Sequence, residues 1–445
     1  MERKIIKKII LAWVFFPVVS VIVFFSYCLC WTFYLLYAQT DAPQSQPKVP
    51  LNPVRVYKVT SYLLICIYEN LTGPFIPSIL QYGWHKLSSE GKKKPSVRKN
   101  IRYGPKPRNR LDVYHPNHVS SKNKRYNDHM GHSAPNSSQQ QTDIPVIIFI
   151  GTSWNSGNKD TCMPVAHNLQ SQGYIVIVPD ITIYPIGKIA DMVEDIQRCI
   201  FWTHTHIRSF RGDPSQIYLM GHGAGSLLSA LTIIHDVCAT LNVLPPNNTS
   251  IKIPLWDNNI RRTELPRVHG LILFSGVYDI TYYYAYLYKK GLEQVHALPR
   301  VMGNKPDAFL QCSPSYLLNH ALNNIHNREQ LKMLLPRKVV LFHGDQQDTF
   351  NPVTTTHNFC SLLESAGIPS VKLNIYDHIK HISPKIDLIV PTRPLCINLL
   401  KDIKECCKGQ GVMIGGQLKD EKEMTNKDKT KIRSSRRRMS QVRHE

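Results

Sequence analysis

Six short apolar runs recur through the middle of the chain, and stretches with helical character separate them. They occupy residues 146–151, 174–180, 217–221, 270–276, 338–344 and 371–377. Runs without a polar side belong to strands that are buried on both faces, as in parallel sheets covered by helices. The pattern predicts an α/β fold with a mostly parallel sheet and helices on both faces. The segment RLDVYHP, residues 110–116, predicts one more short strand ahead of them.

The third run continues into LMGHGAG, residues 219–225, which an apolar helical stretch follows. A nucleophile elbow has the pattern G-x-S-x-G, because strand and helix meet there in a strained turn that needs small neighbours. Gly221 and Gly225 hold the two outer glycine positions. Gly223 stands where the nucleophilic serine is expected and has no side chain that could attack a carbonyl. The stretch is therefore either a hydrolase elbow without its nucleophile or a plain glycine-rich turn.

Acidic and histidine residues follow the last two runs, in the order elbow, acid, histidine. This is the chain order of the α/β-hydrolase triad, and strand carboxyl ends are where open α/β sheets place their sites. We expect His381 to be the triad histidine, with His378 as its rival. Asp348 is the favoured acid, with Asp345 nearby, although an aspartate usually stands one residue earlier, where this chain has Gln347. Loss of the acid at Gln347 stays open as an alternative.

Four segments together resemble the isoprenylcysteine methylesterase group of α/β-hydrolases, which is similar to BD-FAE-like carboxylesterases and kynurenine-formamidase-like enzymes. They are YGPKPRNRLDVYHP (103–116), GTSWNSGNK (151–159), DITIYPIGKIADMVEDI (180–196) and RGDPSQIYLMGHGAG (211–225). The resemblance covers roughly residues 100–395. It implies an α/β-hydrolase fold, a serine at position 223, and esters of lipid-like or small hydrophobic acids as ligands.

The resemblance also implies an oxyanion hole built from backbone N–H groups, which stabilise the charge that develops on a carbonyl oxygen. It aligns Gly151 and Thr152 with the oxyanion loop of the group, and Ala224 follows the nucleophile position. Ser226, about one helical turn beyond Gly223, and Ser153 in the oxyanion loop are the alternative nucleophiles.

An apolar run without charges extends from Ile9 to Tyr37 and is long enough to cross a bilayer. Aromatic residues near its ends and basic residues before it predict a single-pass signal anchor, in the endoplasmic reticulum or another endomembrane, with the domain in the lumen. Sequons at Asn70, Asn136, Asn247 and Asn248 agree with that side. The basic tail and the pair Cys406-Cys407, which would suit acylation, favour the cytosolic side.

The net charge of +22 lies largely in basic runs at the start, at residues 91–110 and in the tail. These runs lack the patterns of RNA-binding sheets and zinc fingers, so we expect no nucleic-acid partner. The 11 cysteines form no CxxC pair, and no metal site or cofactor is expected. The expected domains are an anchor at 1–40, a membrane-proximal segment and basic linker at 41–99, an α/β-hydrolase domain at 100–400 and a disordered basic tail at 401–445. Within the domain, 117–143 is a low-complexity insert and 239–266 an insertion.

These observations favour a membrane-anchored α/β-hydrolase of the carboxylic-ester hydrolase kind that has lost its nucleophile. A pseudoenzyme that binds a lipid-like ligand or a protein, or a tether that acts through its tail, is one alternative. An active esterase that uses another serine is the other. The membrane bilayer and a hydrophobic ester are the expected partners.

Overall fold

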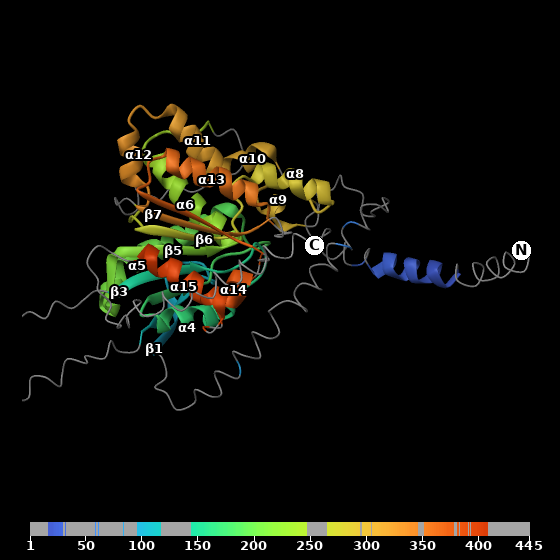
Figure 1. Cartoon of the computed structure of the whole chain (residues 1–445), viewed down its shortest axis with the longest axis horizontal. Coiled ribbons are helices and arrows are strands. Elements are labelled where there is room, and N and C mark those ends of the chain that lie inside the picture. Colours follow the sequence, from blue (N-terminus) through green and yellow to red (C-terminus); the bar gives the residue numbers. More distant parts are fainter. Residues whose placement is uncertain are drawn as a thin grey trace, which may run out of the picture. The chain divides into compact units, whose positions relative to one another are not determined.

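The structure is a computed structural model, and it describes part of the chain (Figure 1). It describes residues 17–29, 96–116, 144–246, 265–293, 296–303, 305–345, 351–377, 381, 383–389, 391 and 393–407, together with the single positions 32, 58, 61 and 83.

One sheet organises the described residues, with eight strands in the order β1-β2-β4-β3-β5-β6-β7-β8. β2 runs antiparallel to both β1 and β4, and every other neighbouring pair is parallel. The carboxyl ends of the parallel strands therefore meet along one edge of the sheet. The strands are β1 (Ser96–Arg102), β2 (Arg110–His115), β3 (Ile144–Ile150), β4 (Ile175–Pro179), β5 (Gly212–His222), β6 (Gly270–Phe274), β7 (Lys338–Gly344) and β8 (Ser370–Tyr376).

Helices cover both faces of this sheet, as Figure 1 shows. One face packs mainly against α5 (Ile189–His206), α6 (Ala224–Thr240) and α13 (Val353–Ser365), and α11 (Pro314–Asn324) packs against α6 and α13. The other face packs against α4 (Met163–Ser171) and α15 (Pro394–Cys407), with α14 (Ser383–Asp387) beside α15. The remaining helices are η2 (Lys159–Cys162), η3 (Ile207–Phe210), α8 (Ile280–Lys290), α9 (Ala297–Val301), α10 (Pro306–Gln311) and α12 (Arg328–Leu334).

Successive side chains of the central strands enter two different cores. In β3, Ile148 and Ile150 pack on the α6 side, whereas Ile147 and Phe149 pack on the α15 side, and all four are buried. This alternation explains why the strand is apolar at every position, since neither face meets water. The mostly parallel sheet and its two helical layers confirm the predicted α/β-hydrolase fold.

The six predicted apolar strands and the strand at 110–116 are all present. The sheet also contains β1, which begins in the segment predicted as a linker (41–99) and ends inside the predicted hydrolase domain (100–400). α15 continues through Cys406 and Cys407, which are only 5% and 4% exposed. Their thiols lie in the core beneath the sheet, so an acyl chain could reach them only if the end of α15 opened.

Among the residues that the structure describes, none of the helices is both long enough and apolar enough to span a membrane. A helix covers residues 17–29, which is part of the apolar run from Ile9 to Tyr37. The rest of that run, the sequons and the basic tail beyond residue 407 lie outside the described residues.

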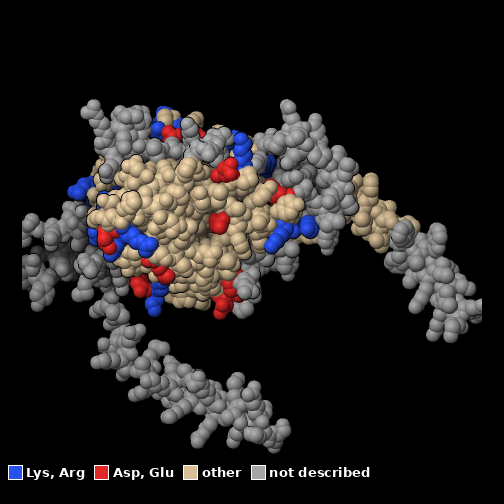
Figure 2. All heavy atoms as spheres, turned by 90° about the horizontal axis from the view of Figure 1, so that it is seen from above, with Lys and Arg blue, Asp and Glu red and all other residues tan. Residues whose placement is uncertain are grey.

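Charged side chains are sparse on the face shown in Figure 2. Lysines and arginines stand there in small groups, with acidic side chains between them. The described part of this face therefore has charges of both signs side by side.

Candidate active site

Gly223 forms the tip of a sharp turn between β5 and α6. Its backbone angles are φ 55° and ψ −112°, a positive φ that L side chains rarely adopt. The turn is fixed on both sides, because the Gly223 N–H donates to the Phe274 carbonyl at 2.9 Å and the Ser226 N–H donates to the Gly223 carbonyl at 3.1 Å. This strained strand-to-helix turn is the local geometry of a nucleophile elbow.

The two flanking glycines are required by close backbone contacts. A Cβ on Gly221 would overlap the carbonyl of Gly225 and the amide of Ser226. A Cβ on Gly225 would overlap the carbonyl oxygen of Ile150 in the neighbouring strand β3. The spacing of glycines that the sequence shows is therefore a packing requirement of the turn.

His381 faces the place where a side chain at position 223 would be. A Cβ added to Gly223 would lie 3.2 Å from His381 Nε2 and 3.4 Å from His381 Cε1, and no other described atom outside the adjoining residues would lie within 4 Å. A serine hydroxyl extends one bond beyond Cβ, so small adjustments would bring it within hydrogen-bond reach of the ring. The histidine ring and the empty elbow position therefore have the relation of a general base to its nucleophile.

His222 supports this arrangement from the residue before the elbow. Its Nε2 lies 2.9 Å from the His381 carbonyl oxygen, and the two rings lie 5.0 Å apart at 47°. Because a carbonyl only accepts, the His222 ring nitrogen is the donor. The end of β5 thus holds the backbone of the histidine as well as the elbow.

The acid position is only partly described. Asp345 directly follows β7, and its N–H donates to the Tyr376 carbonyl at 3.1 Å. Asp348 and Gln347 lie outside the described residues, as does His378. The expectation that Asp348 is the acid remains a prediction.

The expected oxyanion residues lie beside the elbow. Ile150 pairs with Gly221, so Gly151 and Thr152 continue from β3 next to the turn, and Ala224 opens α6. A Cβ on Gly151 would overlap the Cys162 sulfur, and Lys385 Nζ donates to the Gly151 carbonyl at 2.9 Å. Thr152 is 3% exposed, and its hydroxyl has no hydrogen-bond partner among the described residues. The loop is thus held close to the nucleophile position.

The two alternative serines have different surroundings. Ser226 is fully buried, and its hydroxyl donates to the Phe274 carbonyl at 2.8 Å. It would have to break this bond and leave the core to meet a substrate. Ser153 is exposed, and its N–H donates to the Ser156 carbonyl at 2.9 Å within the loop. Only Ser153 of the two is accessible from solvent.

Three side chains near the site were not predicted from the sequence. His296 caps α9 by accepting from the Leu298 N–H at 3.1 Å. Its pKa is lowered to about 4, chiefly because burial disfavours the charged ring, and the positive charge of Arg300 adds to this effect. Arg300 is 8% exposed and lies over the Tyr184 ring, 5.5 Å from its centre. The sequence signal that could have found Arg300 is its charge inside the otherwise apolar run ALPRVM, residues 297–302.

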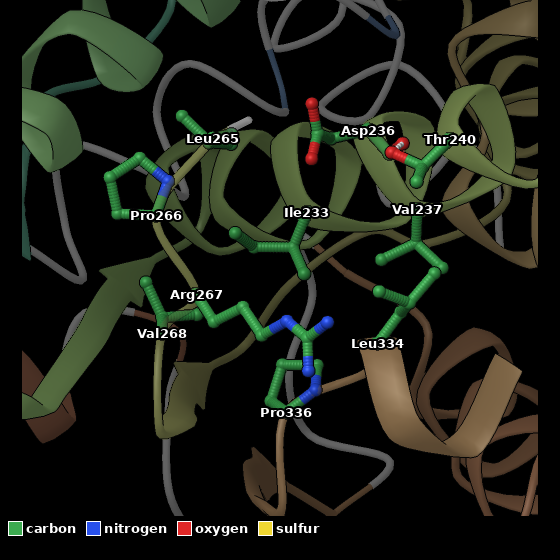
Figure 3. Close-up of a pocket in the computed structure, with 10 residues that line it drawn as sticks. All are labelled: Ile233, Asp236, Val237, Thr240, Leu265, Pro266, Arg267, Val268, Leu334 and Pro336. Carbon is green, nitrogen blue, oxygen red and sulfur yellow. Dashed lines mark hydrogen bonds between the residues drawn. The ribbon is translucent and has the colours of Figure 1, made fainter. Parts of the chain in front are cut away.

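The hollow shown in Figure 3 lies elsewhere. It is formed by the second half of α6 and by the segments that lead into β6 and β7, so it lies at the amino ends of these strands. Its lining residues are Ile233, Asp236, Val237, Thr240, Leu265, Pro266, Arg267, Val268, Leu334 and Pro336. This hollow is on the opposite edge of the sheet from Gly223 and is not part of the candidate active site.

Within the described ranges, no cluster of three or more histidine, cysteine, aspartate or glutamate side chains could hold a metal ion.

The family model BD-FAE matches residues 134–321 of the chain. A probable isoprenylcysteine alpha-carbonyl methylesterase of Arabidopsis thaliana is 26% identical over 324 residues, which are 73% of this chain and 57% of that protein. A second Arabidopsis thaliana protein, an isoprenylcysteine alpha-carbonyl methylesterase, is 27% identical over 310 residues, 69% of this chain and 60% of the relative. The chain thus spans less than two thirds of the length of these relatives.

Among solved structures, the esterase Est2 of Thermogutta terrifontis aligns with a TM-score of 0.46 and 18% identity. The alignment covers 73% of this chain and 95% of the esterase.

Proposed function

We propose that this chain, a carboxylesterase-like α/β-hydrolase, is anchored in an endomembrane and binds lipid-like or small hydrophobic esters without forming an acyl-enzyme. The observation that carries the proposal is the pairing of Gly223 with His381. The His381 ring faces position 223 across a turn with a positive φ, which supports a hydrolase-like site, whereas the atom that would attack the ester is missing.

The missing hydroxyl removes covalent catalysis and leaves a weaker route. In a serine hydrolase, loss of a triad member costs a factor of about 10⁴–10⁶ in rate, although some catalysis above water persists. In the route that remains, His381 takes a proton from a water molecule, and the hydroxide attacks the ester carbonyl. The N–H groups of Thr152 and Ala224 would hold the oxyanion, and the proton would pass to the departing alcohol.

The ligand class comes from the relatives. Two of them are described as isoprenylcysteine alpha-carbonyl methylesterases, which supports an ester with a lipid-like group for this chain. The apolar run from Ile9 to Tyr37 supports a membrane setting for such a ligand. Fractionation of tagged full-length chain tests the anchor: extraction by carbonate at high pH would contradict it.

Hydrolysis of a short-chain nitrophenyl ester tests the missing nucleophile. We expect the native chain to be nearly silent, Gly223→Ser to gain activity, and Gly223→Ser/His381→Ala to lose that gain. Gly223→Ala is the matched control, because it adds the Cβ without the hydroxyl. Full activity of the native chain that disappears in Ser153→Ala or Ser226→Ala would overturn the proposal.

A further inference from the structure

Lys385 joins the segment that carries His381 to the loop after β3. It lies in α14, four residues after His381, and its Nζ donates to the Gly151 carbonyl at 2.9 Å. The same segment meets the elbow at its other end, where the His381 ring faces position 223 and the His381 carbonyl accepts from His222. One short stretch of chain therefore contacts both the elbow and the expected oxyanion loop.

The contact with Lys385 sets the direction of the next N–H group along the chain. The Gly151 carbonyl and the Thr152 N–H belong to one planar trans peptide, in which the two groups point in opposite directions. A cation that holds the carbonyl oxygen on one side therefore turns the N–H toward the other side. Cys162 restricts the same peptide, because its sulfur lies where a Cβ of Gly151 would be. Gly151 is thus held from two directions.

The Thr152 N–H has no acceptor among the residues that the structure describes, although Thr152 is only 3% exposed. Nearly all buried backbone N–H groups in proteins have a partner, whereas an oxyanion donor gains its partner from the ligand. The loop starts beside the elbow, because Ile150 pairs with Gly221 and its carbonyl oxygen lies against Gly225. The unused N–H therefore supports Thr152 as the donor of this loop.

The charge of Lys385 acts on this peptide without a described carboxylate to neutralise it. The acidic residue on the same helix, Asp387, pairs instead with Arg393 at 2.7 Å. A positive charge on a carbonyl oxygen polarises the peptide, and this makes the N–H of the same peptide a stronger donor. Lys385 thus orients the Thr152 N–H and also strengthens the hydrogen bond that it can donate.

We propose that Lys385 is a positioning residue of this site: its ammonium group holds the Gly151 carbonyl and thereby directs the Thr152 N–H toward the carbonyl oxygen of a bound ester. The inference rests on the proposed function, because it adds a residue to the same oxyanion hole. Lys385 itself does not touch the ligand and transfers no proton.

Hydrolysis by full-length chain in the Gly223→Ser background tests this role in the reaction. Adding Lys385→Met should lower kcat for a short-chain nitrophenyl ester about ten-fold with little change in KM, because an oxyanion donor acts mainly on the transition state. Lys385→Arg keeps a cationic donor and should recover part of the loss. A merely structural role would not give this separation of kcat from KM together with recovery by arginine.

Lys372→Met is the matched control, because it removes the same charge at a distance from the oxyanion loop. Lys372 is also half-buried, but its ammonium group pairs with Asp402 and Glu405 of α15. This variant should leave kcat unchanged. An unchanged kcat in Lys385→Met, or an equal loss in the control, would overturn the inference.

Hydrogen exchange provides a second test that needs no turnover, on full-length chain with Gly223 in place. Lys385→Met should speed the exchange of amides in residues 151–158 several-fold and leave the amides of α6 unchanged, because only the loop loses a contact. Unchanged exchange in the loop would refute the assignment.

The two tests separate this inference from the proposed function. If Gly223→Ser gains no hydrolysis, the proposed function is contradicted, and the exchange comparison decides on Lys385. If Lys385→Met does not fold, Lys385→Gln, a shorter and neutral donor, takes its place in both experiments.

Discussion

The His222 ring nitrogen Nε2 donates a hydrogen bond to the carbonyl oxygen of His381, over 2.9 Å. The residue that precedes the elbow therefore fixes the backbone of the histidine that faces it. This contact joins the end of β5 to a residue that lies 159 positions further along the chain.

This contact predicts a positioning role for His222. In the Gly223→Ser background, His222→Phe should lower kcat for a nitrophenyl ester about ten-fold with little change in KM, because a misplaced base affects the reaction more than binding. His222→Gln keeps a donor and should restore part of the loss. An unchanged kcat in His222→Phe would show that the contact does not position His381.

The elbow glycines should differ in their effect on stability. Gly225→Ala should lower the free energy of unfolding by about 3 kcal/mol, because its Cβ would overlap the Ile150 carbonyl. Gly223→Ala should cost only about 1–2 kcal/mol, since it strains a positive φ but requires only a small shift of the His381 ring, which lies 3.2 Å from the added Cβ. Urea denaturation measures both, and equal losses would contradict this account of the turn.

A buried ion pair holds η2 against β2. Lys159 Nζ lies 3.0 Å from Asp112 Oδ1, and the side chains are 7% and 0% exposed. Lys159→Met would leave the carboxylate without its cation and should cost about 3–5 kcal/mol. Lys159→Met/Asp112→Asn should recover much of the lost stability. Thermal denaturation of the native protein and both variants measures these differences. A double variant no more stable than the single one would rule out an unpaired charge as the cause.

His235 on α6 should make the protein sensitive to acid. Burial lowers its pKa from 6.5 to about 4, so the folded state binds fewer protons than the unfolded state between these values. Stability is then fully present above about pH 6.5 and falls as the pH drops toward 4, by at most about 3 kcal/mol. His235→Gln does not titrate there and should show a flatter pH dependence of unfolding. If the native protein and His235→Gln lost stability in parallel as the pH falls, His235 would be excluded as the source of the acid sensitivity.

The sequence predicted the parallel strands because their burial on both faces leaves an apolar signature. It missed β1, whose residues SVRKNIR are charged and mostly exposed at the edge of the sheet, so they carry no such signature. The strand pairs by backbone hydrogen bonds, which do not depend on side-chain polarity.

The candidate site likewise has residues that the sequence predicted and residues that it missed. Gly223 and His381 could be predicted because their chain order and strand-end positions are fixed by the topology. Arg300 and Tyr184 could not be paired in advance, since their contact depends on how α9 packs against the loop after β4. Gln347 and Asp348 remain alternatives for the acid position because neither is among the described residues.

The bare backbone at Gly223 has a consequence for how such proteins are found. Phosphonate and fluorophosphonate reagents register a serine hydrolase by bonding covalently to the oxygen at the elbow. Gly223 offers them no oxygen, although the turn, the facing histidine and the neighbouring loop are in place. A survey that detects hydrolases through that covalent bond would therefore miss this protein. Reversible ligands of the site would be needed to detect it.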